Sequence, residues 1–163
     1  MTLNQEQIMN YFTRIGLNYD DYKCHKLDGQ LLAKLCFAHN ISIPFENLDI
    51  LNHKMISLDG SILYDKIITK HRGGLCFELN GLSEIFLRSL GFGVKDLSSR
   101  FFRDAGDDIP MQRHRLLKVE AVDGTYIWDI GIGQRSPKYP LRLAEGLVQK
   151  QCGEVYKLEK EAF

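Results

Sequence analysis

Residues 71–81 read HRGGLCFELNG, and this stretch decides the fold that we expect for the chain. Its two adjacent glycines permit a tight turn, and Cys76 opens a run with apolar residues at helical spacing that ends at Gly91. Cys76 is therefore expected in the first turn of a helix, where unpaired backbone N–H groups favour a thiolate. The alternative interpretation is a buried cysteine that packs as a small apolar residue.

A histidine and an aspartate flank a predicted hairpin further along the chain. His114 opens one β-rich run, Asp129 closes the next, and Asp123-Gly124 between the runs is a strong turn signal. A cysteine at a helix start, with a histidine and a carboxylate on neighbouring strands, is the arrangement of papain-like cysteine enzymes. We expect His114 to take the proton from the sulfur and Asp129 to orient the imidazole.

The register expected for this hairpin separates the histidine from the aspartate. A two-residue turn at Asp123-Gly124 pairs Val122 with Thr125 and leaves His114 and Asp129 on one face, but four residues apart along the ladder. That offset is about 13 Å at about 3.3 Å per residue. A direct hydrogen bond then requires a longer loop, a bulge, or a chain that leaves the ladder near His114, and we predict one of these.

Five segments together resemble the arylamine N-acetyltransferase family. Residues 72–80 (RGGLCFELN) resemble its active-site signature and residues 43–48 (IPFENL) its upstream segment. Residues 114–117 (HRLL) resemble the family's histidine segment, and residues 129–133 (DIGIG) resemble its aspartate segment. Residues 11–16 (YFTRIG) resemble its first helix. The resemblance implies a ping-pong reaction in which acetyl-coenzyme A acetylates the cysteine. An arylamine, hydrazine or N-hydroxyarylamine then accepts the acetyl group.

The resemblance also implies roles for individual residues. Cys76 is the nucleophile, His114 the general base and acid, and Asp129 its orienting partner. Gly131 and Gly133 fall in the segment that lies against coenzyme A in the family.

The acceptor pocket implied by the resemblance contains Phe45 and Ile132. Ile132 stands where bacterial members commonly have an aromatic residue, so one stacking face is lost. Outside the pocket, we expect Glu46 and Arg72 to form a buried ion pair that fastens the glycine turn to the first lobe. The alternative is a pair of solvated charges that contribute little.

The apolar periodicity predicts helices first and strands second. Helices are expected over residues 4–15, 28–38, 45–48, 59–70 and 76–90, with short β-rich runs from about residue 93. Segregated helices and strands are typical of an α+β fold. We predict a helical domain over residues 1–92 that carries the cysteine. A β domain over residues 93–163 is expected to carry the histidine and the aspartate.

The resemblance implies a more detailed architecture. Family members have a helical bundle, then an antiparallel β-barrel-like domain, then a third domain that closes over a cysteine-proteinase-like catalytic core. The chain ends at Phe163, inside the second of these, so we expect an incomplete β domain and no C-terminal lid domain. Open strand edges are templates for association, so we expect a homodimer or a tendency to aggregate, and weakened coenzyme A binding.

The composition argues against several classes of protein. Lysine plus arginine (21) equals aspartate plus glutamate (21), so no net positive field indicates nucleic acid or an anionic membrane as partner. No apolar stretch could span a membrane and no signal peptide is recognisable, so we expect a cytoplasmic protein. The four cysteines are irregularly spaced and the histidines lack zinc-type spacing, so neither disulfides nor a metal are expected.

Two other functions remain open from the sequence alone. The same cysteine, histidine and aspartate could serve an acyl-thioester hydrolase or an amide synthase, because a site without a lid admits water. The chain could also be a catalytically impaired, truncated remnant that acts as an interaction module.

Overall fold

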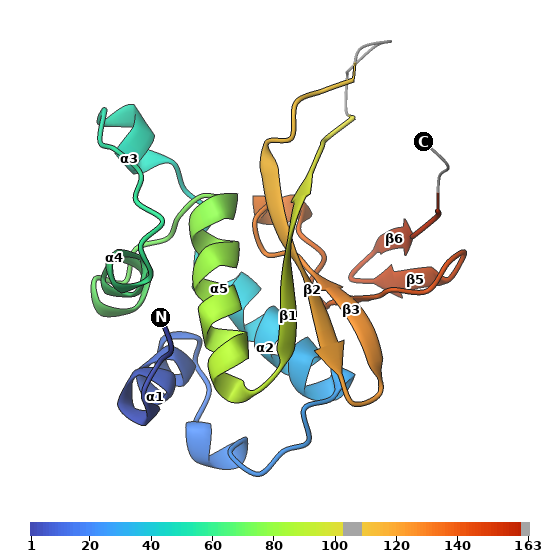
Figure 1. The fold of residues 1–163 in the computed structure, drawn as a ribbon, viewed down its shortest axis with the longest axis horizontal. Helices are drawn as coiled ribbons and strands as arrows, with labels where there is room; N and C mark the ends of the chain where they lie inside the picture. The colour runs from blue at the N-terminus through green and yellow to red at the C-terminus, as the bar shows by residue number, and fades with distance from the viewer. Residues whose placement is uncertain (103–108, 161–163) are drawn as a thin grey trace.

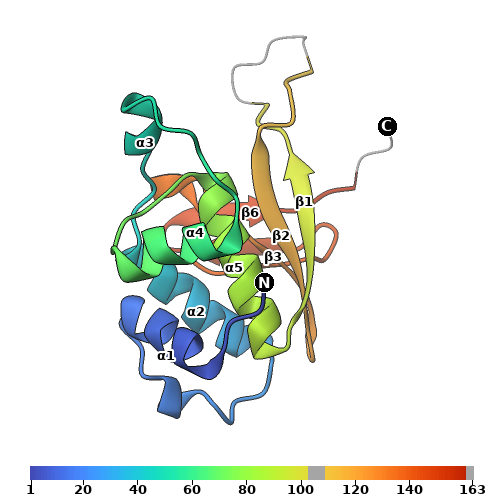
Figure 2. The same cartoon turned by 60° about the vertical axis from the view of Figure 1, so that its left-hand side comes forward.

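The computed structural model describes residues 1–102 and 109–160. Helical elements come first: α1 (Gln5–Arg14), η1 (Tyr19–Asp21, 3₁₀), α2 (Gly29–Ser42), α3 (Leu48–Leu51), α4 (Gly60–Tyr64), η2 (Asp65–Thr69, π) and α5 (Cys76–Leu90). The elements that follow are β1 (Gly93–Ser99), β2 (His114–Ala121), β3 (Gly124–Trp128), η3 (Gly133–Arg135, 3₁₀), β4 (Leu141–Arg142), β5 (Val148–Gln151) and β6 (Glu154–Lys157). The predicted α+β order is confirmed. α5 packs against β1 and β2 of the sheet, α4 covers another side of α5, and α2 contacts β3 (Figures 1 and 2).

Helix capping explains where most of the predicted helices begin. The Asn4 side chain accepts a hydrogen bond from the Gln7 N–H at 2.9 Å, and Asp28 caps α2 in the same way. Gly91 ends α5 in the left-handed conformation, with a φ of 102°. These three helices are confirmed, although α2 continues to Ser42, four residues beyond its predicted end.

Two helix predictions are wrong in detail. The helix expected over residues 45–48 forms instead at Leu48–Leu51, because Phe45 is held in a parallel bridge with Gly74. The helix expected over residues 59–70 starts correctly after Asp59 but widens into the π-helical turn η2.

The strands form an open antiparallel sheet in the order β1-β2-β3-β4 and a separate pair, β5-β6. Among the described strands β1 and β4 are both sheet edges, so the predicted barrel-like closure is not found. One apolar core runs from Phe12 and Phe86 in the helices to Leu117 and Trp128 in the sheet. The division at residue 92 and the homodimer stay predictions, and residues 103–108 and 161–163 of the second predicted domain lie outside the described residues.

The β2–β3 hairpin is confirmed, but its predicted register is wrong. Ala121 pairs with Gly124, so Val122 and Asp123 form the turn in place of Asp123-Gly124. A long-range contact explains the difference, because Asp123 Oδ1 accepts a hydrogen bond of 2.8 Å from the Gly29 N–H at the start of α2. The turn is thus placed by α2 as well as by its own residues.

No helix within residues 1–102 and 109–160 is long and apolar enough to cross a membrane. The same residues contain no group of three or more histidine, cysteine, aspartate or glutamate side chains placed to hold a metal ion. All four cysteines are free: Cys36 is buried in the core, Cys76 is half-buried, and Cys24 and Cys152 are exposed.

Candidate active site

Cys76 is the first residue of α5, as the sequence predicts. The residue before it, Leu75, has an extended backbone, and its N–H donates to Glu78 Oε2 at 3.0 Å. The unpaired N–H groups of this first turn and the helix dipole lie beside the sulfur. The local environment therefore suits a negative charge on Cys76.

The double glycine before Cys76 packs against the upstream segment of residues 44–46. Gly74 N–H donates to Pro44 O at 3.3 Å, and Glu46 N–H donates to Gly74 O at 3.1 Å. A Cβ at Gly73 would lie 1.9 Å from Pro44 O, a distance that no side chain tolerates. The two segments that carry the family resemblance are thus one structural unit, and glycine is required for their close approach.

A cluster of half-buried charges around the buried Glu78 supports this unit. Arg72 Nη2 lies 2.7 Å from Glu46 Oε1 and 3.2 Å from Asp49 Oδ1, so the expected Arg72–Glu46 ion pair is present. The sequence reasoning missed Lys66, whose Nζ lies 2.7 Å from both Asp49 Oδ2 and Glu78 Oε1. Burial disfavours the ammonium, yet hydrogen bonds to these two carboxylates keep the pKa of Lys66 above its usual range.

The Arg14 guanidinium clamps four backbone carbonyls around the same unit. It donates to Ser42 O at 2.7 Å, Ile67 O at 3.1 Å, and the carbonyls of His71 and Arg72 at 3.3 Å each. The planar fork of arginine suits this multiple contact. α1 is thereby tied to the end of α2, to η2 and to the loop before α5.

His114 and Asp129 are in direct contact. His114 Nε2 and Asp129 Oδ2 are 2.6 Å apart, and the two side chains are 2% and 5% exposed. In the observed register Asp129 would stand opposite Leu116, only two residues from His114. Because the pairing of β3 ends at Trp128, the following chain is free to bring the carboxylate to the imidazole. Of the three predicted possibilities, the structure shows a chain that leaves the strand pairing, together with the changed hairpin register.

Asn80 holds the Asp129 carboxylate in place, a role that the sequence reasoning did not assign. Its amide donates to Asp129 Oδ1 at 3.2 Å and to Arg115 O at 2.6 Å, and its carbonyl accepts from the Ile130 N–H at 3.3 Å. The signal for this role is the spacing, because Asn80 lies four residues after Cys76 on the same face of α5. One helix therefore carries both the thiol and the anchor of the carboxylate.

The electrostatics of the site favour a charged imidazole. Burial alone would lower the pKa of His114, but the hydrogen bond with Asp129, together with the nearby Cys76 thiol, outweighs it and raises the pKa to about 9. His114 Nδ1 is buried and has no hydrogen-bond partner among the described residues. The Phe101 ring lies against the imidazole, with 4.7 Å between centroids, and shields it from water.

The loop after Asp129 passes so close to Cys76 that only glycine fits. A Cβ at Gly131 would lie 2.7 Å from both Cα and Cβ of Cys76. Gly133 has a φ of +67°, and its position for a Cβ is 3.5 Å from Phe45. The two glycines are therefore explained by close packing and backbone conformation, independently of any ligand.

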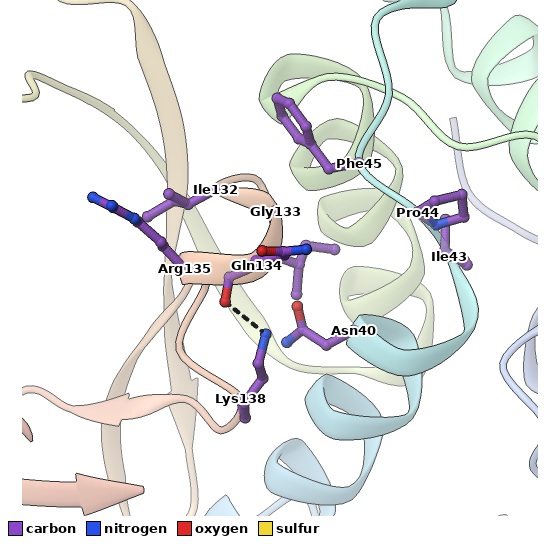
Figure 3. Close-up of a pocket in the computed structure, with 10 residues that line it drawn as sticks. Asn40, Ile43, Pro44, Phe45, Ile132, Gly133, Gln134, Arg135 and Lys138 are labelled. Atoms are coloured by element: carbon purple, nitrogen blue, oxygen red, sulfur yellow. Dashed lines mark hydrogen bonds between the residues drawn. The ribbon is translucent and has the colours of Figure 1, made fainter. Parts of the chain in front are cut away.

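A half-open cavity of about 620 Å³ lies beside this loop (Figure 3). Phe45, Ile132 and Gly133 line it, together with Asn40, Ile43, Pro44, Ile130, Gln134, Arg135 and Lys138. The predicted pocket residues Phe45 and Ile132 thus face one cavity. Gly131 does not line it and packs on Cys76 instead.

Comparison with known proteins identifies the family of the chain. A family model described as N-acetyltransferase matches residues 28–163. The chain is also 42% identical over 132 residues to the arylamine N-acetyltransferase / N-hydroxyarylamine O-acetyltransferase of Salmonella typhimurium, over 81% of this chain and 47% of the relative. The chain belongs to the arylamine N-acetyltransferase family. It spans about half the length of the curated relatives it matches.

Solved arylamine N-acetyltransferases share the fold of the chain. The enzyme from Salmonella typhimurium superposes with a TM-score of 0.89 at 36% identity, over 99% of this chain and 57% of that one. The arylamine N-acetyltransferase of Mycobacterium marinum, solved in complex with CoA, superposes with a TM-score of 0.85 at 35% identity, over 94% and 57%. The arrangement of helices and open sheet is therefore that of the corresponding part of the family.

Proposed function

We propose that this chain carries out acetyl transfer from acetyl-coenzyme A to an arylamine, hydrazine or N-hydroxyarylamine, with Cys76, His114 and Asp129 as the catalytic triad. The observation that carries the proposal is the 2.6 Å contact between the buried side chains of Asp129 and His114, next to the start of α5, where the Cys76 thiol lies 3.9 Å from the carbonyl of Arg113, the residue before His114. This is the order of groups found in cysteine-proteinase-like cores. Family membership supports the choice of reaction.

In the first half-reaction Cys76 becomes acetylated. Since Nε2 of His114 is occupied by Asp129, its Nδ1 takes the thiol proton. The thiolate attacks the carbonyl carbon of acetyl-coenzyme A, a carbon–sulfur bond forms, and the bond to the coenzyme A sulfur breaks. The departing thiolate takes the proton from His114. The imidazolium that exists between these steps is stabilised by the Asp129 carboxylate.

In the second half-reaction the amine removes the acetyl group. Its nitrogen attacks the carbonyl of acetyl-Cys76 and loses a proton to His114, and the Cys76 thiolate leaves. His114 then returns this proton to the Cys76 thiolate, which restores the resting thiol and neutral imidazole. The same site would hydrolyse the acetyl-enzyme if water replaced the amine, which makes exclusion of water a condition for transfer.

The substrates are proposed to meet at the loop after Asp129. Coenzyme A is the donor because a family relative was solved with it, and Gly131 and Gly133 are proposed to lie along its path. The cavity bordered by Phe45 and Ile132 is apolar on one side, which suits the ring of an aromatic acceptor.

Intact-protein mass spectrometry tests the proposal directly. Incubation with acetyl-coenzyme A should add one acetyl group to the wild type and none to Cys76→Ala. Addition of an arylamine should then remove the group and release the N-acetylated amine. An unmodified wild-type protein whose Cys76 is acetylated by 4-nitrophenyl acetate would contradict coenzyme A as donor, and no reaction with either reagent would contradict acyl transfer.

A further inference from the structure

The carboxylate of Glu78 lies in the first turn of α5, two residues after the nucleophile. Its Oε2 accepts the Leu75 N–H at 3.0 Å, its Oε1 lies 2.7 Å from Lys66 Nζ, and its side chain is only 3% exposed. A buried negative charge in the same helical turn as a thiol opposes formation of the thiolate, because little water is present to screen it. The site therefore needs a group that compensates Glu78.

Lys66 is the cation that contacts this carboxylate. Its Nζ is also 2.7 Å from Asp49 Oδ2, and its side chain is 12% exposed. Arg72, the other cation of the cluster, contacts Glu46 and Asp49. In the part of the chain that the structure describes, only Lys66 forms a salt bridge with Glu78. The cluster thus holds three carboxylates against two cations, and loss of Lys66 leaves Glu78 without a countercharge.

The π-helical turn η2 carries Lys66 to this position. Its backbone departs from the α-helical pattern, as Lys70 N–H donates to Asp65 O at 2.8 Å, five residues back. A π-helical turn rotates the side chains that follow it relative to those before it and occurs frequently at functional sites. The chain therefore departs from regular helix where the ammonium must face α5.

We propose that Lys66 is a positioning residue for Cys76 and that it acts through Glu78. Its ammonium holds the carboxylate against the Leu75 N–H, which fixes the start of α5. It also cancels the negative charge that would disfavour the thiolate. No bond to Lys66 forms or breaks. The inference rests on Cys76 being the nucleophile of the proposed function.

The pH dependence of Cys76 alkylation tests this inference without coenzyme A or an amine. Iodoacetamide reacts with the thiolate, and peptide mass spectrometry separates Cys76 from the exposed Cys24 and Cys152. Lys66→Gln should raise the pH midpoint by about one unit and slow alkylation at pH 7 about tenfold. Lys66→Arg keeps the charge and should stay within about twofold of the wild type.

A double variant separates charge from shape. Lys66→Gln combined with Glu78→Gln removes both charges but keeps a carbonyl to accept the Leu75 N–H, so the midpoint should return close to that of the wild type. Lys70→Gln is the matched control, because its ion pair with Asp65 is 67% and 48% exposed and should not influence the sulfur. Thermal melts identify any variant that is unfolded at the assay temperature. If Lys66→Gln is unfolded, the test uses Glu78→Gln alone, which should lower the pH midpoint of Cys76 alkylation.

Two results would overturn the inference. One is a wild-type midpoint in folded Lys66→Gln; the other is a double variant as slow as the single one. The proposed function fails separately, when a wild-type Cys76 with normal alkylation does not accept an acetyl group from acetyl-coenzyme A.

Discussion

Replacement of Gly131 by alanine should place a methyl group directly against Cys76, the proposed nucleophile. The added Cβ would lie 2.7 Å from Cα and Cβ of Cys76 and 2.8 Å from Asn80 Nδ2. Carbon atoms reach their optimal contact at about 3.5 to 4.0 Å, so the loop must move away by about 1 Å. Such overpacking costs about 2 kcal/mol, which for a chain of this size lowers the Tm by about 4 to 8 °C.

The same displacement should also slow the acetylation of Cys76. A misplacement of about 1 Å at a catalytic centre costs about a hundredfold in rate. Acetylation of Cys76 by 4-nitrophenyl acetate, followed by mass spectrometry in a single turnover, measures this step without coenzyme A. We expect Gly131→Ala to be acetylated about a hundredfold more slowly than the wild type.

Gly146→Ala is the control for the loss of a glycine as such. Gly146 has a φ of +71° and no atom within 4 Å of a built Cβ, so alanine there is strained but meets no neighbour. It should lower the Tm without slowing acetylation. A Gly131→Ala protein that is acetylated at the wild-type rate would refute the close approach of the loop to Cys76.

Three further predictions concern the groups around the site. Asn80→Asp replaces the amide that donates to Asp129 by a second carboxylate and should slow acetylation of the cysteine more than tenfold and lower the Tm, as measured by mass spectrometry and thermal melts. The pKa of His114 is raised from 6.5 to about 9 in the folded state, so between these pH values the folded protein holds a proton that the unfolded chain has lost. The free energy of unfolding should therefore fall as the pH rises from about 6.5 to about 9. In urea titrations at several pH values, His114→Gln should make this fall smaller. Arg14→Met removes the donors to four carbonyls and should lower the urea midpoint more than Lys23→Met, whose exposed ion pair contributes little.

The parts of the site that follow local rules could be predicted from the sequence. Cys76 starts α5 and Gly91 ends it because turn glycines, apolar spacing and a C-terminal glycine are all local signals. The order of cysteine, histidine and aspartate also followed from the chain alone. Their roles stay predictions until the acetylation experiments are done.

The errors share one physical cause, which is contact between distant segments. Phe45 does not start a helix because it pairs with Gly74, and the turn before Gly124 shifts because Asp123 caps α2. Lys66 gave no sequence signal because its carboxylate partners lie 17 residues before it and 12 residues after it. Single-sequence periodicity contains no information on such pairs.

The Arg14 clamp has a consequence for synthesis on the ribosome. Arg14 donates to a carbonyl 58 positions further along the chain, so at about 5 to 20 residues per second it emerges about 3 to 12 seconds before that partner exists. α1 has 10 residues, too few for a stable isolated helix, and Tyr11 stacks on Phe86, which is made later still. α1 is therefore made well before the residues that protect it, and pulse proteolysis of stalled nascent chains should find α1 cleavable until α5 has emerged.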